Sequence, residues 1–331
     1  MKIAVDAMGG DLGPQEIVKG VIAGIQEYGN NALLVGKEDV LKELVDKYNS
    51  FDRSKLEILH AEDIVTMTDS PLTALRHKKK SSIIVGINAV KEKLADCFIS
   101  TGNTGAVMAA ATIKMGLING VERAGIATVL PNANKSVTII IDVGASVDSK
   151  PKHLLHFAIM GSEYARVVLQ KDDILVGLLN IGEEETKGNE LAKETFVLLK
   201  EKLTNFYGNV EGRDIFKGKS DVVVCDGFDG NILLKVSEGL AETLFGMIRE
   251  GIQEKLLYKI GALMLKGFFK KFKKVIEYSE YGGAPLLGVD GYCIICHGRS
   301  SANAIKNAMR VAGNCQQNKI NELIEKRISL I

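Results

Sequence analysis

The sequence predicts an α/β fold built around a largely parallel, buried β-sheet. Short apolar runs rich in β-branched residues recur along the chain, and longer stretches with helical spacing separate most of them. The runs are apolar throughout, which is the pattern of strands covered by helices on both faces. Alternation of such strands with helices is typical of α/β proteins.

The predicted elements can be followed in order along the chain. The strands are Lys2–Val5, Ala32–Val35, Leu56–Leu59, Cys97–Ile99, Ile126–Leu130, Val137–Ile141, Ile174–Leu179, Val222–Cys225 and Tyr292–Ile295. An apolar helical stripe at Ile17, Val21 and Ile25 follows the first strand. A second stripe, after the next strand, comprises Val40, Leu41, Leu44 and Val45. Because no internal repeat or low-complexity linker interrupts this pattern, residues 1–331 are predicted to form one α/β domain.

Composition and charge exclude several classes of protein. With 46% hydrophobic and 25% charged residues, the chain resembles an ordinary globular protein rather than a disordered or fibrous one. A net charge of +1 gives no electrostatic reason to expect nucleic-acid binding. The 5 cysteines do not suggest a secreted disulfide framework. The N-terminus lacks the apolar run of a signal peptide, and no stretch approaches about 18 uninterrupted apolar residues, so we expect a cytoplasmic protein without membrane spans.

Polar, glycine-rich clusters follow six of the predicted strands. They are residues 6–11, 100–105, 142–148, 180–188, 226–231 and 297–301. Ligands of open α/β sheets bind outside the carboxyl ends of the strands, so clusters in this position are predicted to converge on one cleft. Turns and helix caps also favour glycine, Asp and Asn, and this simpler interpretation accounts for some of the individual residues.

The cluster at 100–105 has the pattern of an anion site. Asn103, Thr104 and Gly105 stand where a strand is expected to turn into a helix over residues 106–115. Free N–H groups at a helix start, with small residues that allow close approach, suit an anion such as phosphate. A plain helix start has the same pattern. The sequences GxGxxG and GxxxxGK[ST] are both absent, which argues against a dehydrogenase and a nucleotide kinase.

Two histidine-containing patterns have simpler explanations than a metal or a haem. His153 and His156 lie three residues apart on a predicted helix, but no third ligand is evident, so we expect a surface pair. Cys293, Cys296 and His297 match the CxxCH pattern of covalent haem attachment. The run around the cysteines has the pattern of a buried strand and no export signal precedes it, so we expect small core hydrophobes.

Residues 255–276 are predicted to be amphipathic. At about 100° per residue, one face carries Leu257, Ile260, Met264, Phe268 and Phe272. The opposite face carries Lys255, Lys259, Lys266, Lys270 and Lys273. The pattern fits a helix lying in a membrane interface, and it fits a dimer contact with a solvated lysine face equally well. Because Gly261 and Gly267 weaken the helix, the segment is predicted to form the tip of a helix–turn–helix.

Several motifs, taken in chain order, resemble one known family. They are Asp6-Ala-Met-Gly-Gly-Asp11, Ser100-Thr-Gly-Asn-Thr-Gly105, Asp142-Val-Gly-Ala, Asn180-Ile-Gly-Glu-Glu, Asp226-Gly-Phe, Gly283-Ala-Pro-Leu-Leu-Gly288 and His297-Gly-Arg-Ser-Ser-Ala-Asn-Ala-Ile-Lys306. From the first residue to about residue 310, the sequence resembles the phosphate acyltransferases of phospholipid synthesis, the PlsX family.

The resemblance implies conversion of acyl-acyl carrier protein and inorganic phosphate to acyl phosphate and free carrier protein, with no nucleotide or metal cofactor. It implies a three-layer α/β/α sandwich, Rossmann-like and related to the isocitrate and isopropylmalate dehydrogenases and to phosphotransacetylase. It further implies a homodimer with a protruding helical pair, assigned to residues 235–277, and peripheral association with the membrane. There a glycerol-3-phosphate acyltransferase would take the product.

Clustering and charge suggest roles for individual residues. Phosphate is predicted to lie on Gly102, Asn103, Thr104 and Gly105, with Arg299 nearby. Lys187 would orient phosphate or polarise the thioester, and Asn231 and His297 would hold the oxyanion, with His297 protonating the leaving thiolate. Other residues predicted to line the site are Asp6, Gly9, Gly10, Asp142, Glu183 and Asp226. Each also has a simpler explanation as a cap or a surface charge.

Two positions depart from the family pattern. Thr101 stands where the family usually has Ala, and Asp229 stands where it usually has Val. A carboxylate close to a phosphate site would repel the anion. We therefore expect Asp229 to face away from the site or to pair with a cation.

Other assignments remain open. The acidic carrier protein is expected to dock on lysines, either Lys78–Lys80 within the basic run 76–80 or those near 266–274, although a basic run is most often a solvated helix face. A phosphotransacetylase-like enzyme would use acyl-CoA instead. A metal-dependent decarboxylating dehydrogenase would need a divalent ion, and a non-catalytic scaffold would bind carrier protein and lipid without consuming phosphate.

Overall fold

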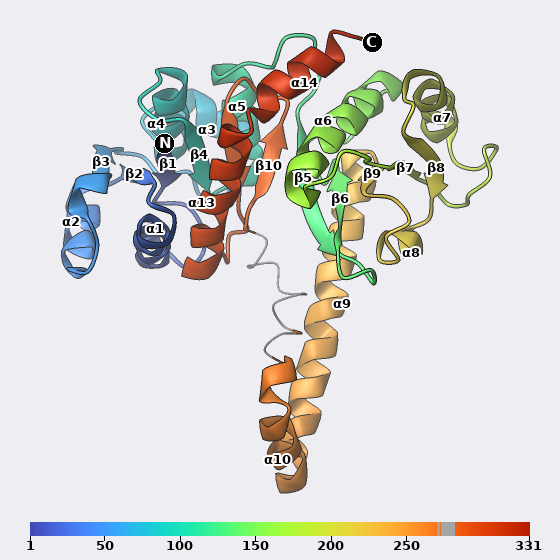
Figure 1. Cartoon of the computed structure of the whole chain (residues 1–331). Coiled ribbons are helices and arrows are strands. Elements are labelled where there is room, and N and C mark those ends of the chain that lie inside the picture. Colours follow the sequence, from blue (N-terminus) through green and yellow to red (C-terminus); the bar gives the residue numbers. More distant parts are fainter. Residues whose placement is uncertain (270–271, 273–281) are drawn as a thin grey trace.

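The apolar runs of the sequence form one large mixed sheet in the computed structural model, which describes residues 1–269, 272 and 282–331 (Figure 1). Within these residues the sheet has 11 strands in the order β3-β2-β1-β4-β11-β10-β5-β6-β9-β7-β8. The strands are β1 (Lys2–Asp6), β2 (Asn31–Gly36), β3 (Leu56–His60), β4 (Cys97–Ser100), β5 (Gly125–Pro131), β6 (Val137–Ile141), β7 (Val176–Leu179), β8 (Phe206–Val210), β9 (Val222–Val224), β10 (Ala284–Leu287) and β11 (Tyr292–Ile295).

The sheet is largely parallel, as predicted. Strands β3, β2, β1, β4 and β11 pair in parallel, and so do β6, β9, β7 and β8. Between the two sets, the pairings β11–β10, β10–β5 and β5–β6 are all antiparallel. Three reversals in succession mean that the two parallel sets run in opposite directions.

Two strands, β8 and β10, are not among those predicted from the sequence. Strand β10 contains Pro285, and a proline normally argues against a strand inside a sheet. Strand β8 contains Gly208, next to a register irregularity in its pairing with β7. In both cases tertiary pairing overrides a weak local preference.

Helices cover both faces of the sheet. They are α1 (Pro14–Tyr28), α2 (Glu38–Asp46), α3 (Pro71–His77), α4 (Ser82–Lys91), α5 (Thr104–Lys114), α6 (Pro151–Leu169), α7 (Glu190–Lys202), α8 (Gly212–Ile215), α9 (Gly227–Glu254), α10 (Leu256–Met264), α13 (Ala302–Gln317) and α14 (Ile320–Ile328), with a 3-10 turn η1 at Arg53–Lys55. Helices α1, α2, α6, α7, α13 and α14 contribute to one buried apolar cluster. Helices α3, α4, α5 and α8 contribute to a second cluster. The predicted three-layer α/β/α sandwich is therefore confirmed.

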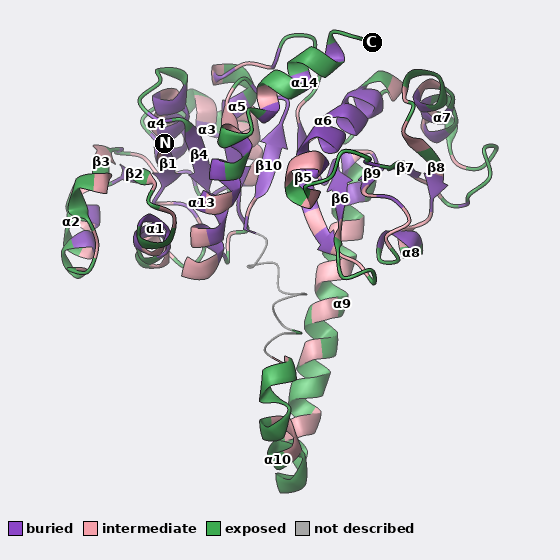
Figure 2. Cartoon of the chain, in the orientation of Figure 1, coloured by how far each residue is buried: buried purple, intermediate pink, exposed green. Residues whose placement is uncertain are grey.

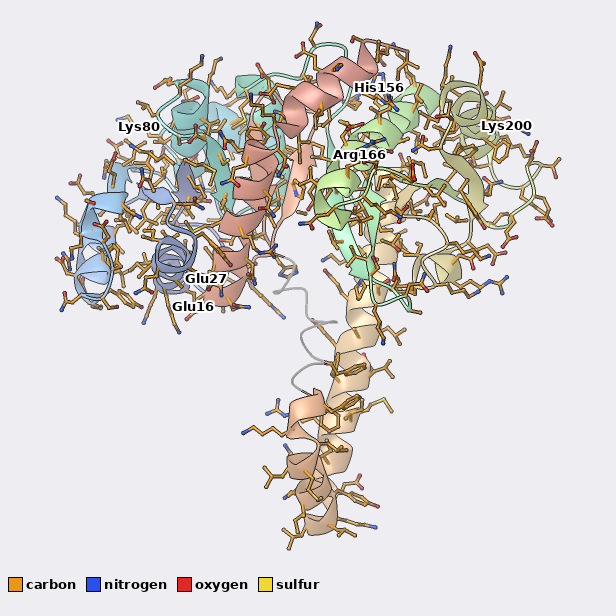
Figure 3. The ribbon with its side chains drawn as sticks, viewed as in Figure 1. Glu16, Glu27, Lys80, His156, Arg166 and Lys200 are labelled. Carbon is orange, nitrogen blue, oxygen red and sulfur yellow. The ribbon has the colours of Figure 1, made fainter. Side chains whose placement is uncertain are left out.

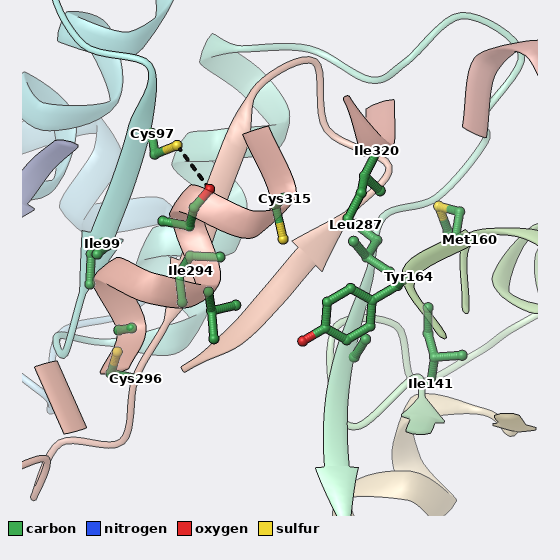
Figure 4. Packing of buried hydrophobic residues seen from close by; sticks show 14 of the residues in the cluster. Cys97, Ile99, Ile141, Met160, Tyr164, Leu287, Ile294, Cys296, Cys315 and Ile320 are labelled. Carbon is green, nitrogen blue, oxygen red and sulfur yellow. Dashed lines mark hydrogen bonds between the residues drawn. The ribbon is translucent and has the colours of Figure 1, made fainter. Parts of the chain in front are cut away.

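A strand that is covered by helices on both faces needs an unbroken apolar run, because alternate residues of a strand point to opposite faces of the sheet. In β1, Ile3 and Val5 belong to one cluster and Ala4 belongs to the other. Most strands of the sheet are buried between the helices (Figure 2). All 5 cysteines are buried and free, as predicted for small core hydrophobes. Figure 4 shows Cys97 and Cys296 in this core, where the Cys97 thiol donates to the carbonyl of Ala312.

Helices α9 and α10 form a pair that protrudes from the body (Figure 1). Helix α9 has 28 residues, or about 42 Å at about 1.5 Å per residue. The chain reverses at Lys255, whose backbone is extended, so the turn does not fall at Gly261 or Gly267 as the sequence suggested. No helix among the described residues is long and apolar enough to cross a membrane. Of the predicted protrusion 235–277, residues 270–271 and 273–277, with Lys270 and Lys273, lie outside the described residues.

Candidate active site

Three of the six polar clusters meet at the carboxyl ends of β1, β4 and β11. Buried Asp6 accepts a hydrogen bond of 2.7 Å from the Ser100 hydroxyl and also accepts from the backbone N–H of Gly9. The backbone N–H of Asp11 donates to the carbonyl of Gly298 at 2.7 Å. A Cβ at Gly9 would lie 2.7 Å from the backbone nitrogen of Gly102, so only glycine allows this approach. We call residues 6–11, 100–105 and 297–301 the first group.

The start of α5 lies in the first group. The Asn103 side chain accepts from the N–H of Ala106 at 3.0 Å and donates to three carbonyls of residues 66–69. Its amide is therefore committed to protein partners and fixes the turn. Among the described residues, the backbone N–H groups of Thr104 and Gly105 have no acceptor, as is usual at the start of a helix. The Thr101 hydroxyl beside them is buried and has no partner within the described chain.

His297 and Arg299 complete the first group. The His297 Nδ1 accepts from the backbone N–H of Arg299 at 3.2 Å, so a neutral His297 ring carries its proton on Nε2. The Arg299 side chain is 80% exposed, and its Nε lies 3.9 Å from an oxygen of Asp11. Both side chains are thus available to solvent and to a ligand.

The other three clusters form a second group around Asp142, which is fully buried at the carboxyl end of β6. Its carboxylate accepts from the backbone N–H groups of Ile126, Gly144, Ala145 and Ser146, at 2.7–3.1 Å. Burial raises the pKa of Asp142 to about 6, against the lowering effect of these hydrogen bonds. Asp142 therefore shapes the loop that follows β6.

The start of α9 packs directly on this loop. A Cβ at Gly230 would lie 1.9 Å from the carbonyl oxygen of Asp142, so no larger residue fits there. Asp226 caps α9 by accepting from Phe228, and its other oxygen accepts from the N–H of Ser149 at 2.9 Å. Asn231, one residue beyond Gly230, is exposed and has no hydrogen-bond partner among the described residues.

Residues 180–188, the loop that carries Lys187, belong to the same group. Asn180 donates to the Lys187 carbonyl at 3.1 Å, and buried Asn209 donates to the carbonyl of Glu184 at 2.9 Å. Lys219 forms an ion pair of 2.5 Å with Glu183. The loop is also held by an ion pair between Glu185 and Lys200, which Figure 3 labels on α7. Within the described residues the Lys187 ammonium itself has no partner, and its side chain is exposed.

A pocket of about 420 Å³ lies beside this loop and the start of α9. Its lining comprises Leu154, Leu178, Leu179, Asn180, Ile181, Gly188, Asn189, Leu191, Ala192, Cys225, Asp226 and Asp229. Burial raises the pKa of Asp229, and the neighbouring Asp226 raises it further. No cation among the described residues pairs with Asp229, which is one of the residues that line the pocket. That Asp229 faces away from bound phosphate stays a prediction.

The whole chain is similar to known proteins. A family model described as "Fatty acid synthesis protein" matches residues 1–323. The "Phosphate acyltransferase" of Dictyoglomus turgidum is 48% identical over 332 residues, covering 100% of this chain and 98% of that protein. The chain belongs to the phosphate acyltransferase family. It is accordingly a phosphate acyltransferase of fatty acid synthesis.

Solved structures place this phosphate acyltransferase within a wider fold class. A phosphotransacetylase from Streptococcus pyogenes superposes with a TM-score of 0.64 at 16% identity, covering 96% of this chain and 94% of that chain. A 4-hydroxythreonine-4-phosphate dehydrogenase from Klebsiella pneumoniae gives 0.55 at 13% identity, with coverage of 96% and 99%. At these identities the likeness confirms the predicted fold class alone.

The predicted catalytic residues of the phosphate acyltransferase divide between the two groups. Lys187 and Asn231 lie in the second group, whereas His297 and the turn at 102–105 lie in the first. The strands that carry the groups run in opposite directions, and no hydrogen bond between described residues joins one group to the other. That both groups face a single cleft, across the twist of the sheet, stays a prediction.

One surface assignment from the sequence is wrong, and a second stays a prediction. His153 and His156 are buried rather than a surface pair, and Figure 3 labels His156 on α6. The described residues contain no group of three or more His, Cys, Asp or Glu able to hold a metal. In the basic run 76–80, Lys78 already pairs with Asp69, and Lys80 pairs with Glu62 at 3.0 Å. Part of that positive charge is therefore neutralised within the chain.

Proposed function

We propose that this phosphate acyltransferase transfers an acyl group from acyl-acyl carrier protein to inorganic phosphate. The products are acyl phosphate and free carrier protein. The full-length match to phosphate acyltransferases is the observation that carries the proposal. The unpaired N–H groups of Thr104 and Gly105 support a phosphate subsite in the first group. The unpaired Lys187 supports a polar centre in the second.

The proposed reaction needs positioning and charge stabilisation more than a protein nucleophile. A phosphate oxygen attacks the thioester carbonyl carbon, the tetrahedral intermediate collapses, and the C–S bond breaks. The thiolate then takes a proton, which the imidazolium form of His297 can donate from Nε2. Lys187 and Asn231 would stabilise the oxyanion, since their donor groups are free of protein partners. Holding phosphate beside the carbonyl supplies the remaining rate enhancement.

We also propose that the enzyme works as a homodimer at the membrane surface. None of the residues of α10 is buried, and Met264 and Leu257 are 84% and 74% exposed. An apolar acyl phosphate released there can pass to a membrane glycerol-3-phosphate acyltransferase without crossing water. Exposed apolar residues on α9, including Val236, Leu240 and Leu244, provide a face for a second copy.

The second candidate function uses acyl-coenzyme A as the donor, because the fold is that of phosphotransacetylases. Rates with palmitoyl-acyl carrier protein and palmitoyl-coenzyme A, measured at saturating phosphate, distinguish the two. We expect kcat/KM to favour the carrier protein by at least about tenfold, since only the carrier adds protein–protein contacts. A preference for coenzyme A would establish the alternative.

A further inference from the structure

The pocket between the 180–188 loop and the start of α9 has a composition unsuited to phosphate. Two of its lining residues, Asp226 and Asp229, are carboxylates, and none of the described residues that line it is a Lys, Arg or His. Two carboxylates without a cation repel an anion. The volume of about 420 Å³ is nevertheless that of a small-molecule site, which typically spans roughly 300–1,000 Å³.

The lining combines an apolar wall with hydrogen-bonding groups near its mouth. The apolar part comprises Leu154, Leu178, Leu179, Leu191 and Ala192. Asn189 uses its carbonyl oxygen to accept from Ala192, which leaves its amide N–H groups without a partner among the described residues. Asp229 has no ion-pair or hydrogen-bond partner in the described part of the chain, so it can accept hydrogen bonds. A chain of methylene and amide groups satisfies both parts of such a pocket.

We infer that this pocket receives the amide-bearing pantetheine arm that carries the acyl thioester, with Asp229 accepting from an amide N–H of the arm and Asn189 donating to an amide oxygen. The inference rests on the proposed function, because it takes the donor to be an acyl thioester. Residues Gly188 and Asn189 line the pocket directly after Lys187. Lys187 does not itself line the pocket, so the inference places the thioester at the end of the pocket formed by Gly188 and Asn189, which follow Lys187 in the chain.

The inference makes Asp229, which departs from the family pattern, a determinant of donor binding. The test compares Asp229→Val and Asp229→Asn with wild type, measuring KM separately for the acyl thioester and for phosphate. We expect Asp229→Val to raise the thioester KM about tenfold, the usual effect of losing a hydrogen bond to a charged group. The phosphate KM stays unchanged, and Asp229→Asn, which keeps an acceptor, remains close to wild type.

Asp173→Val is the matched control, since Asp173 is exposed and is not among the residues that line the pocket. Thermal melting verifies that each variant folds. A fall in the phosphate KM of Asp229→Val would overturn the inference, because it would mean that the pocket holds phosphate. If Asp229→Val lowers the thioester KM, and lowers it more for longer acyl chains, the inference is also overturned, because the pocket would then be an acyl-chain site. So would unchanged values of both constants. If wild type releases no thiol in response to phosphate, the proposed function fails instead.

Discussion

Lys187 keeps an unpaired ammonium in a loop where two of the three glutamates form ion pairs with lysines outside the loop. Lys219 and Lys200 hold Glu183 and Glu185, so neither carboxylate competes for Lys187. We predict that Lys187→Ala lowers kcat by about a hundredfold, as expected when a donor to a developing oxyanion is lost. Steady-state kinetics at saturating phosphate measure this. Lys193→Ala, at an exposed position on α7, should stay within about twofold of wild type, and near-normal turnover of Lys187→Ala would contradict the role.

Asp142 gives the protein a defined dependence of stability on pH. Its pKa is about 6 in the folded state, above the ordinary value of 3.8, so the folded state holds the extra proton more tightly. Below about pH 4, this tighter proton binding stabilises the folded state by about 3 kcal/mol. The stabilisation is lost as the pH rises through about 6. Asp142→Asn should lack this loss. The free energy of unfolding in urea, measured at pH 4 and pH 7, tests this prediction, with Asp173→Asn as the control. If Asp142→Asn shows the same difference between the two pH values as wild type, Asp142 is not the group responsible.

The sequence pattern placed many polar residues of the two groups at strand ends, but it did not reveal the contacts that each one makes. Asp142 and Asp226 follow predicted strands, and both lie in the second group. Both carboxylates accept hydrogen bonds from backbone N–H groups. These hydrogen bonds depend on the geometry of the loops, which cannot be predicted from the spacing of residues in the sequence. Asn209, which holds the loop of Lys187, was not predicted because it lies in a strand that the sequence pattern did not reveal.

At the level of single helices, the proposed membrane association depends on the exposed apolar residues of α10. We predict that Leu257→Glu combined with Met264→Glu abolishes flotation with liposomes, because each carboxylate must leave water to enter the interface. Both side chains are exposed, so the fold should be unaffected. A control that adds the same charge at exposed polar positions, Gln253→Glu with Gln317→Glu, should float like wild type. If the variant with Leu257→Glu and Met264→Glu floats as well as the control variant, α10 does not bind the membrane.

The elements themselves were predicted unequally well. Helices α1 and α2 were predicted from their periodic apolar stripes and nine strands from their short apolar runs, because most of these apolar residues face a buried layer. Strand β10 was missed because of Pro285. The chain reverses at Lys255, the first residue of the segment predicted to form a helix–turn–helix tip, but the exact position of the turn was not predicted.

For the whole molecule, the prediction concerns assembly. Leu240 and Leu244 are 59% and 50% exposed on α9, and a second copy would cover them. Leu240→Glu combined with Leu244→Glu should shift the protein from dimer to monomer, measured by light scattering after size-exclusion chromatography. The variant with Gln253→Glu and Gln317→Glu should remain dimeric. A wild-type protein that is monomeric at micromolar concentration would contradict the dimer.

The order of the sheet could not be predicted from the sequence. Strands β10 and β11 come late in the chain yet lie between β4 and β5, and long-range pairing of this kind leaves no local pattern. For the same reason the division of the six clusters into two groups was not predicted. The family could still be assigned from the motifs without knowledge of the strand order, because the motifs are short local sequences.

The central claim is that phosphate is the acyl acceptor. The most direct measurement is release of free carrier protein from palmitoyl-acyl carrier protein by the purified enzyme, with and without phosphate, while hydroxylamine traps the acyl phosphate. We expect release only when phosphate is present, and one equivalent of trapped acyl hydroxamate per thiol. Release that proceeds equally without phosphate, or no release although the carrier binds, would contradict the account.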